Sequence, residues 1–359
     1  MNKTLNTASV EALLNWYDRS RRDLPWRKTR DPYCIWISEI MLQQTRVEAV
    51  KPYYARFLQA CPDVASLASI SEDELLKLWE GLGYYSRARN LQRAARSVME
   101  QHGGVLPRNY EALRGLSGIG EYTAGAIASI AYDERVPAVD GNVLRVLTRL
   151  IGSYEDITLP QTKKGLRDAL SSIIPDRAGD FNQALIELGA KVCVPNGAPK
   201  CEECPLRNVC VASREGLCAQ IPVKAPKKPR RIEKRTVFLI RDGSRTALCK
   251  RAGKGLLAGL FELPNTEGHL DRDVATEYLR ALGVEPLRIE RIEDAKHIFT
   301  HIEWHMIAYS VRISAEFDGW HGEGGMMLVP NAELFSKFAI PSAFSAYTKY
   351  LLGKDARAR

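Results

Sequence analysis

A basic, proline-containing segment divides this chain into two parts with different patterns. Residues 224–235, KAPKKPRRIEKR, hold seven basic residues and two prolines. That composition does not bury a core and is typical of a linker. We place the linker at residues 216–234, between a first region of residues 1–215 and a second region of residues 235–359. Such a segment can also contact nucleic-acid phosphate, because clustered positive charges serve that purpose.

The first region carries helical signals. SVEALLNWYDRS begins at Ser9, which we expect to cap a helix, and repeats its apolar residues at helical spacing. SEDELLKLWEGLG starts with Ser71 and Glu74 at capping-box spacing and stops at glycines. About ten such segments, and no convincing alternating strand, predict a mainly α region.

The second region changes to strand-like patterns. TVFLI, TALCKR and HIEWHMIAYSVRI are rich in β-branched and aromatic residues, and the helical stretch RDVATEYLRALG lies between them. We expect a smaller α/β domain here.

Composition and charge narrow the class of protein. The chain has 359 residues, of which 45% are hydrophobic and 26% charged, as in soluble globular proteins of two domains. No apolar run approaches the roughly 20 residues of a membrane span, and the N-terminus lacks the apolar segment of a secretion signal. We therefore expect a cytoplasmic protein. A net charge of +8 suits an anionic partner, although charge alone can also serve only solubility.

Half of the eight cysteines lie within eighteen residues, CVPNGAPKCEECPLRNVC. In a chain without a secretion signal, this crowding predicts a metal site and not disulfides. Zinc sites usually use two C-x2-C pairs, and only one pair is present, so the spacing favours a [4Fe–4S] cluster over zinc. The expected ligands are Cys193, Cys201, Cys204 and Cys210. We expect Cys218 to lie too far along the chain to be needed, and the other three cysteines to be small apolar residues.

The stretch NYEALRGLSGIGEYTAGAIASIAY predicts a helix, a tight glycine turn and a second helix. No strand precedes the glycines, which excludes a dinucleotide-binding motif. Gly118 and Gly120 would let the backbone approach a phosphate, with the amides from Glu121 onward pointing at it. A purely structural turn between packed helices is the alternative.

Two carboxylates are candidates for chemistry. Asp140 directly precedes the amphipathic helix in PAVDGNVLRVLTRL, where it could be a solvent-facing N-cap or a buried acid near bound DNA. Glu39, in WISEIMLQQTRV, has apolar residues three or four positions away on its helix. Such neighbours raise the pKa of a carboxyl by desolvation, so Glu39 could hold a proton at neutral pH. A surface glutamate is the alternative.

Together these features resemble the helix–hairpin–helix DNA glycosylases with an iron–sulfur cluster, and among them the adenine DNA glycosylases of the MutY type. The stretches that carry the resemblance are LPWRKTRDPYCIWISEIMLQQTRV, WEGLGYYSRARNL, AVDGNVLRVL, FNQALIELGA and the cysteine loop. The resemblance implies a six-helix barrel with an iron–sulfur subdomain, followed by a Nudix-like domain. The family usually has six residues in the first cysteine gap, where this chain has seven.

The resemblance also implies an activity, the removal of adenine opposite 8-oxoguanine or guanine in duplex DNA, by a monomer that is nucleoid-associated in a bacterium. Endonuclease III, a related enzyme, has a catalytic lysine two residues after the second hairpin glycine, where this chain has Tyr122. Without that amine no Schiff base forms with the sugar by that route, so we expect base removal without strand cleavage.

The resemblance assigns roles to particular residues. Glu39 would protonate adenine at N7 and Asp140 would stabilise the oxocarbenium-like sugar, with Tyr122 and Asn142 as orienting groups. The implied adenine pocket is formed by Arg22, Trp26, Arg27, Leu42, Val47 and Gln183, although Trp26 and Leu42 taken singly also suit an ordinary core. The implied DNA contacts are Gln44, Thr45, Leu82, Tyr84, Arg87, Gly118 and Gly120, with Leu82 and Tyr84 as a wedge and Arg87, Arg89 and Arg93 facing phosphates. The implied readers of 8-oxoguanine are Phe299, Thr300 and His301.

Three other functions remain open at this point. One is a glycosylase that also cleaves the strand, and another is a non-catalytic DNA-binding iron–sulfur protein. The third is nucleotide hydrolysis by the second region. A Nudix hydrolase needs an R-E-x2-E-E helix, and none follows Phe261–Pro264 (FELP). We therefore expect no pyrophosphohydrolase activity.

Overall fold

The computed structural model describes residues 5–226, 229–317 and 325–351. Lys227 and Lys228 of the basic segment, and parts of the expected second region, lie outside the described residues. The chain forms two compact units. Unit 1 consists of Met1–Ser69 and Arg89–Pro226, and unit 2 consists of Ile70–Ala88 and Lys227–Arg359. This division differs from the expected one, because a segment of the helical region, Ile70–Ala88, belongs with the C-terminal unit.

Unit 1 is helical, as its sequence predicts, and its described residues contain no strand. Its main helices are α1 (Thr7–Ser20), α2 (Pro32–Leu42), α3 (Val47–Ala60), α4 (Val64–Ser69), α6 (Ser86–His102, which starts in unit 2), α7 (Tyr110–Arg114), α8 (Glu121–Tyr132), α9 (Gly141–Ile151), α10 (Pro160–Ser171), α11 (Ala178–Lys191) and α12 (Val211–Arg214). Its short 3-10 helices are η1 (Pro25–Arg27), η2 (Cys201–Glu203) and η3 (Arg207–Val209).

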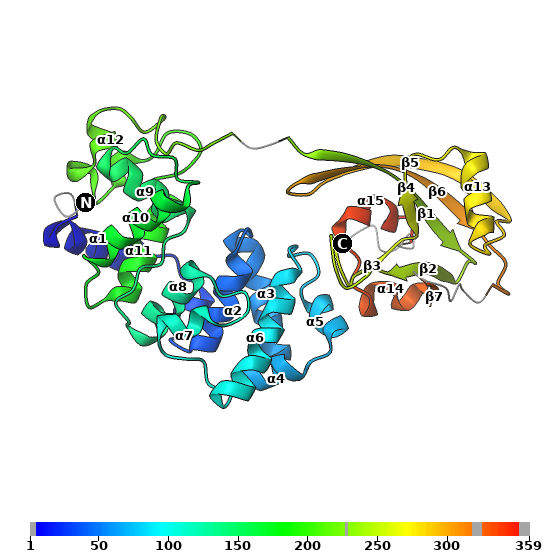
Figure 1. The fold of residues 1–359 in the computed structure, drawn as a ribbon, viewed down its shortest axis with the longest axis horizontal. Helices are drawn as coiled ribbons and strands as arrows, with labels where there is room; N and C mark the ends of the chain where they lie inside the picture. The colour runs from blue at the N-terminus through cyan, green and yellow to red at the C-terminus, as the bar shows by residue number, and fades with distance from the viewer. Residues whose placement is uncertain (1–4, 227–228, 318–324, 352–359) are drawn as a thin grey trace. The chain divides into compact units, whose positions relative to one another are not determined.

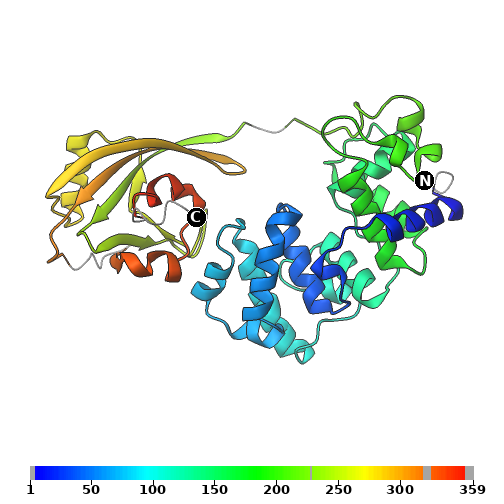
Figure 2. The same ribbon diagram turned by 180° about the vertical axis from the view of Figure 1, so that it is seen from behind.

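One core of unit 1 joins α1, α9, α10 and α11. It includes fully buried Leu13, Leu147, Leu170 and Phe181, one from each helix. Figure 2 shows α1, in blue, against the green helices that follow it in this core. The α1 cap differs from the expectation, because the Asn6 side chain accepts from the Ser9 amide at 3.0 Å and Ser9 is therefore inside the first turn.

Unit 2 contains a mixed sheet in the strand order β3-β2-β1-β6-β5, with β4 beside β1 and β7 beside β2. Its strands are β1 (Arg231–Arg241), β2 (Arg245–Lys250), β3 (Phe261–Glu262), β4 (Asn265–Glu267), β5 (Arg288–Ile298), β6 (Ile302–Arg312) and β7 (Met326–Pro330). Its helices are α5 (Glu72–Leu78), α13 (Arg272–Ala281), α14 (Asn331–Lys337), η4 (Ser342–Phe344) and α15 (Ser345–Thr348). The predicted capping box of Ser71 and Glu74 starts α5.

Both faces of this sheet are covered. Along β1, Val237 and Leu239 pack with α14 and α15, whereas Phe238 packs with α13. Figure 1 shows α13 on one face of the curved sheet and α14 and α15 on the other. β1 and β6 are parallel and every other pair is antiparallel. β1 begins within the expected linker, at Arg231, because its first residues already pair with β6. Among the described residues, no helix is long and apolar enough to span a bilayer.

Candidate active site

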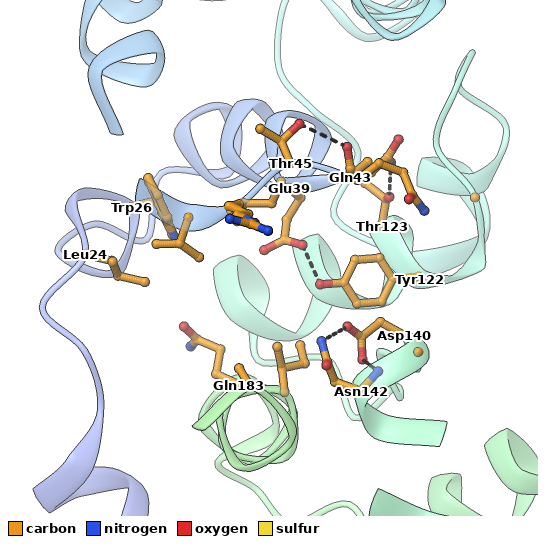
Figure 3. Close-up of a pocket in the computed structure, with 18 of the residues that line it drawn as sticks. Leu24, Trp26, Glu39, Gln43, Thr45, Tyr122, Thr123, Asp140, Asn142 and Gln183 are labelled. Atoms are coloured by element: carbon orange, nitrogen blue, oxygen red, sulfur yellow. Dashed lines mark hydrogen bonds between the residues drawn. The ribbon is translucent and has the colours of Figure 1, made fainter. Parts of the chain in front are cut away.

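A cavity of about 740 Å³ lies within unit 1, between the C-terminal half of α2, the start of α8, the start of α9, and α11 (Figure 3). All four expected catalytic residues, all six expected adenine-pocket residues and four expected DNA contacts line it. They are Glu39, Tyr122, Asp140, Asn142, Arg22, Trp26, Arg27, Leu42, Val47, Gln183, Gln44, Thr45, Gly118 and Gly120. Residues that are up to 161 positions apart in the sequence are thus brought to one cavity.

Glu39 is a buried acid at the wall of this cavity, with only 8% of its surface exposed. The Tyr122 hydroxyl donates a hydrogen bond of 2.7 Å to Glu39 Oε2 (Figure 3). Burial raises the pKa of Glu39 to about 7, although the hydrogen bond from Tyr122 opposes the shift. Burial also raises the pKa of Tyr122 well above its ordinary value, so this phenol is neutral and donates.

Asp140 is the N-cap of α9 and a cavity-lining acid at once. Its Oδ1 accepts from the backbone amides of Asn142 (2.9 Å) and Val143 (2.8 Å), and its Oδ2 accepts from Asn142 Nδ2 (2.7 Å). Burial raises the pKa of Asp140, whereas these three hydrogen bonds favour its carboxylate form and oppose the shift. The N-cap role is therefore present in the structure, and the cap faces the cavity.

The loop that leads into Asp140 is fixed by a close helix contact and a buried amide. At Gly125 of α8, a Cβ would lie 2.2 Å from the Pro137 carbonyl oxygen, so only glycine lets this loop approach the helix. Asn182 of α11 is fully buried and donates to Ser129 Oγ and to the Val136 carbonyl, both at 2.9 Å. Its Oδ1 accepts from the Ala138 amide at 3.0 Å. Asn182 was not predicted, although it adjoins the predicted Gln183.

Arg22 and Arg27 line the cavity, but their guanidinium groups bind a carboxylate that sequence reasoning missed. Glu187 of α11 accepts from Arg22 Nη2 at 2.7 Å and from Arg27 Nη2 at 2.8 Å, and its side chain is fully buried. Burial favours the neutral acid, but the hydrogen bonds and charges of the two arginines lower the pKa of Glu187 to about 2. A buried ion network therefore links the segment before α2, which carries both arginines, to α11.

The mouth of the cavity has unusual backbone geometry. Gln44 is exposed and adopts a backbone φ of +59°, which is rare for a residue other than glycine. Gly118, in the hairpin between α7 and α8, has a φ of +78°, and a Cβ there would lie 2.6 Å from Asn90 Cβ. Gly120 is the N-cap of α8 and a Cβ there would meet nothing within 4 Å. The hairpin is thus a tight turn whose following helix starts at the cavity.

The three expected contacts from the segment Leu82–Arg87 do not line this cavity, and two of them differ from their expected roles. Leu82 is 6% exposed and Arg87 is 7% exposed. The Arg87 guanidinium donates to the carbonyls of Leu82 and Gly83 and lies over Trp79, so it supports the loop from inside. Tyr84, in contrast, is 50% exposed with a φ of +47°.

Tyr84 meets the expected base-reading residues within unit 2. Phe299, Thr300 and His301 form the turn between β5 and β6, where the Phe299 amide donates to the Ile302 carbonyl at 2.8 Å. The hydroxyls of Tyr84 and Thr300 share a hydrogen bond of 2.8 Å. Thr300 and His301 are exposed, while Phe299 packs edge-on against Trp304.

The four expected metal ligands gather in a second site of unit 1. Cys193, Cys204 and Cys210 pack against the core of α1, α9, α10 and α11, and Arg149 donates to Cys193 Sγ at 3.3 Å. Burial raises the pKa of the Cys204 thiol to about 12, so its thiolate needs positive charge beside it. Cys218, which we did not expect to be involved, lines the same site.

In unit 2, Glu262 belongs to the FELP stretch named above. Its carboxylate forms an ion pair with Arg251. The helix after it, α13, carries only Asp273 and Glu277 as acids, as the sequence predicts.

Both regions of the chain match known protein families. Residues 37–175 match the family described as HhH-GPD superfamily base excision DNA repair protein, and residues 236–350 match the NUDIX domain. Adenine DNA glycosylase of Mus musculus is 38% identical, covering 86% of this chain and 71% of the relative. Adenine DNA glycosylase of Buchnera aphidicola subsp. Schizaphis graminum is 34% identical, covering 85% of this chain and 87% of the relative.

Solved structures share the fold of the helical unit. A thermostable thymine-DNA glycosylase is 33% identical with a TM-score of 0.53, covering 57% of this chain and 95% of its own. Endonuclease III in a covalent complex with DNA has a TM-score of 0.50 over 58% of this chain and 95% of its own. At 23% identity that likeness shows the fold alone. The two family matches and the likeness to the thymine-DNA glycosylase structure together confirm the expected fold classes of both regions. This chain belongs to the adenine DNA glycosylases of the helix–hairpin–helix base-excision-repair superfamily.

Proposed function

We propose that the protein removes adenine paired with 8-oxoguanine, or with guanine, from duplex DNA by hydrolysis of the base–sugar bond. The observation that carries the proposal is one cavity holding a buried acid with a pKa of about 7, Glu39, and a hydrogen-bonded carboxylate, Asp140. A base inside a duplex cannot reach such a cavity, so the adenine must be flipped out of the stack.

The two acids have different environments and therefore different tasks. Glu39 holds a proton near neutral pH and gives it to adenine N7, which turns the base into a neutral leaving group. As the C1′–N9 bond breaks, positive charge develops on the sugar. Asp140, held as a carboxylate by Asn142 and the amides of α9, stabilises that charge. Water that has lost its proton to Glu39 then completes the hydrolysis.

The reaction stops at base removal. None of the described residues that line the cavity is a lysine, and Tyr122 occupies the hairpin position where endonuclease III has its catalytic lysine. Cleavage of the strand by a Schiff base needs such an amine. The Tyr122 hydroxyl is instead committed to Glu39. We therefore assign the protein to the glycosylases without lyase activity.

The base opposite adenine would be read by unit 2. The exposed hydroxyl of Thr300 stands at the tip of the β5–β6 turn, next to the exposed ring of Tyr84. A hydroxyl can accept from the N7–H that distinguishes 8-oxoguanine from guanine, while a tyrosine ring can stack in the helix. Thr300→Ala should reduce the preference for 8-oxoguanine over guanine by about 1–3 kcal/mol at most, the range of a base contact. An unchanged ratio would mean that this turn does not read the base.

We further propose that Cys193, Cys201, Cys204 and Cys210 hold one [4Fe–4S] cluster. Among the described residues, no three cysteine, histidine or acidic side chains converge so that they could hold a single metal ion. Ligands of a four-iron cluster stand farther apart than those of one ion, and the Arg149 guanidinium that donates to Cys193 Sγ suits an anionic cluster. When bound, the cluster would cross-link residues 193–210 to the core of unit 1.

We expect the protein to act as a cytoplasmic monomer.

The test uses a duplex with one adenine opposite 8-oxoguanine. We expect a broken strand only after alkali treatment, because the enzyme leaves an abasic site. Strand breakage without alkali at a comparable rate would place the protein among the lyases.

Glu39→Gln and Asp140→Asn should each abolish excision and keep duplex binding, since asparagine can still cap α9. The matched control is Glu48→Gln in α3, where the Glu48 side chain is 77% exposed, and this variant should excise normally. Near-normal activity of either cavity variant would discard the two-carboxylate mechanism.

A further inference from the structure

A fifth cysteine stands in the cysteine site, and neither the expected ligand set nor the proposed function uses it. Cys218 lines the same cavity as the four expected ligands. Cys201 is among the residues that line it with Cys218. A cysteine seventeen residues beyond Cys201 in sequence is therefore its neighbour in space.

The backbone of Cys218 is fixed at this place by one buried arginine. Arg149 of α9 is 4% exposed and donates to the Cys218 carbonyl at 2.9 Å and to the Ile221 carbonyl at 2.8 Å. The same guanidinium donates to Cys193 Sγ at 3.3 Å and to the Val194 carbonyl at 3.0 Å. It thus joins the first expected ligand to the segment that carries Cys218. Because this link is buried and makes four hydrogen bonds, the position of Cys218 is set by the fold.

Cys201 differs from the other three expected ligands in its support. Cys193, Cys204 and Cys210 pack against the hydrophobic core of unit 1, and Cys201 is not among the residues that do so. Cys201 also follows the seven-residue gap, which ends in the short 3-10 helix η2. The core therefore holds three of the expected ligands, while Cys201 and Cys218 both line the site where the fourth ligand is needed.

We propose that Cys218 is an alternative ligand that can take the place of Cys201 in the cluster proposed above. In the exchange, Cys218 would hold the iron that Cys201 otherwise holds, and the proton that the Cys218 thiol gives up would end on the released Cys201 sulfur. No electron is gained or lost, so the exchange needs no oxidant or reductant.

The experiment measures iron per chain and visible absorbance of the full-length protein in four alanine variants, since alanine offers no oxygen that could bind iron. Cys201→Ala and Cys218→Ala should each keep the iron content and spectrum of the unsubstituted chain. Cys201→Ala/Cys218→Ala should lose the cluster, as should Cys204→Ala, whose thiol is packed on the core. Loss of iron or of soluble protein in Cys201→Ala equal to that of the double variant would overturn the proposal.

A second measurement maps the exchange without relying on yield. Iodoacetamide should alkylate Cys218 and spare Cys201 in the native unsubstituted protein, because the bound thiolate is protected. In Cys201→Ala, Cys218 should become protected. Cys218 alkylated to the same extent in both proteins would contradict the exchange. The inference rests on the proposed cofactor, and an unsubstituted chain purified without iron would refute the cofactor itself, whereas iron lost only on removal of Cys201 would refute the exchange alone.

Discussion

At the residue scale, Tyr122 matters for the proton it donates as well as for the lysine it replaces. Its hydroxyl binds Glu39, and a hydrogen bond donated to a carboxylate favours the ionised form. The burial that raises the pKa of Glu39 is therefore partly offset by Tyr122, and the balance lies at about 7. An acid with that pKa can give a proton and regain one at neutral pH.

The pH dependence of excision follows from this balance. The proposed acid works when protonated, so the single-turnover rate constant should be high below pH 7 and fall as pH rises through about 7. Tyr122→Phe removes the hydrogen bond that lowers the pKa of Glu39, while the charges of Asp140 and Arg27 stay. The falling limb should therefore move to higher pH in this variant. A limb that stays in place, or moves to lower pH, would contradict this account of Tyr122.

Several of these residue-scale features could be read from the sequence and others could not. The apolar neighbours of Glu39 on α2 are local, so its raised pKa was predictable from helical spacing. The Glu187 network was not, because its arginines lie 160 and 165 residues away. The burial of Leu82 and Arg87 was missed for a different reason, since the contacts of Arg87 are local but the sequence does not show which side chains of this segment turn inward.

At the element scale, the position of Asp140 depends on how closely α8 and α11 approach the loop before it. Gly125 allows the loop to lie against α8, and Asn182 satisfies three polar groups of that contact. Periodicity predicts that α8, α9 and α11 are helices but not how near they lie. It also missed β5, whose residues are mostly exposed and charged, because an edge strand need not alternate in hydrophobicity.

Gly125→Ala tests the close approach. The new Cβ would meet the Pro137 backbone, so the free energy of unfolding should fall by about 1–3 kcal/mol, the usual cost of overpacking. Gly165→Ala in α10 is the matched control, because its Cβ would meet nothing within 4 Å. Helix propensity should there stabilise the protein by roughly 0.5–1 kcal/mol. Urea unfolding measures both, and equal effects of the two substitutions would refute the packing role of Gly125.

At the scale of the whole molecule, the sequence boundary and the physical boundary differ. Ile70–Ala88 belongs to unit 2 because α5 and the loop after it bind the C-terminal part of the chain. Glu80 accepts from the Ile340 amide at 2.8 Å, Lys77 donates to the Phe338 carbonyl at 3.0 Å, and Lys250 pairs with Asp73 at 2.7 Å. The basic linker predicts that a boundary exists, but no local pattern predicts contacts across 177 to 261 residues of sequence.

This grouping places the proposed wedge and the proposed base-reading turn in one unit, and a double-mutant cycle tests whether they act together. Tyr84→Phe and Thr300→Val each remove one hydroxyl of their shared hydrogen bond and keep the side-chain shape. We expect each to lower the ratio of single-turnover excision rates for adenine opposite 8-oxoguanine and opposite guanine. If Tyr84 acts on reading by holding the Thr300 hydroxyl, the double variant should lose no more than Thr300→Val alone, with a coupling energy of about 0.5–1.5 kcal/mol. Losses that simply add would show that the ring of Tyr84 and the hydroxyl of Thr300 recognise the duplex independently.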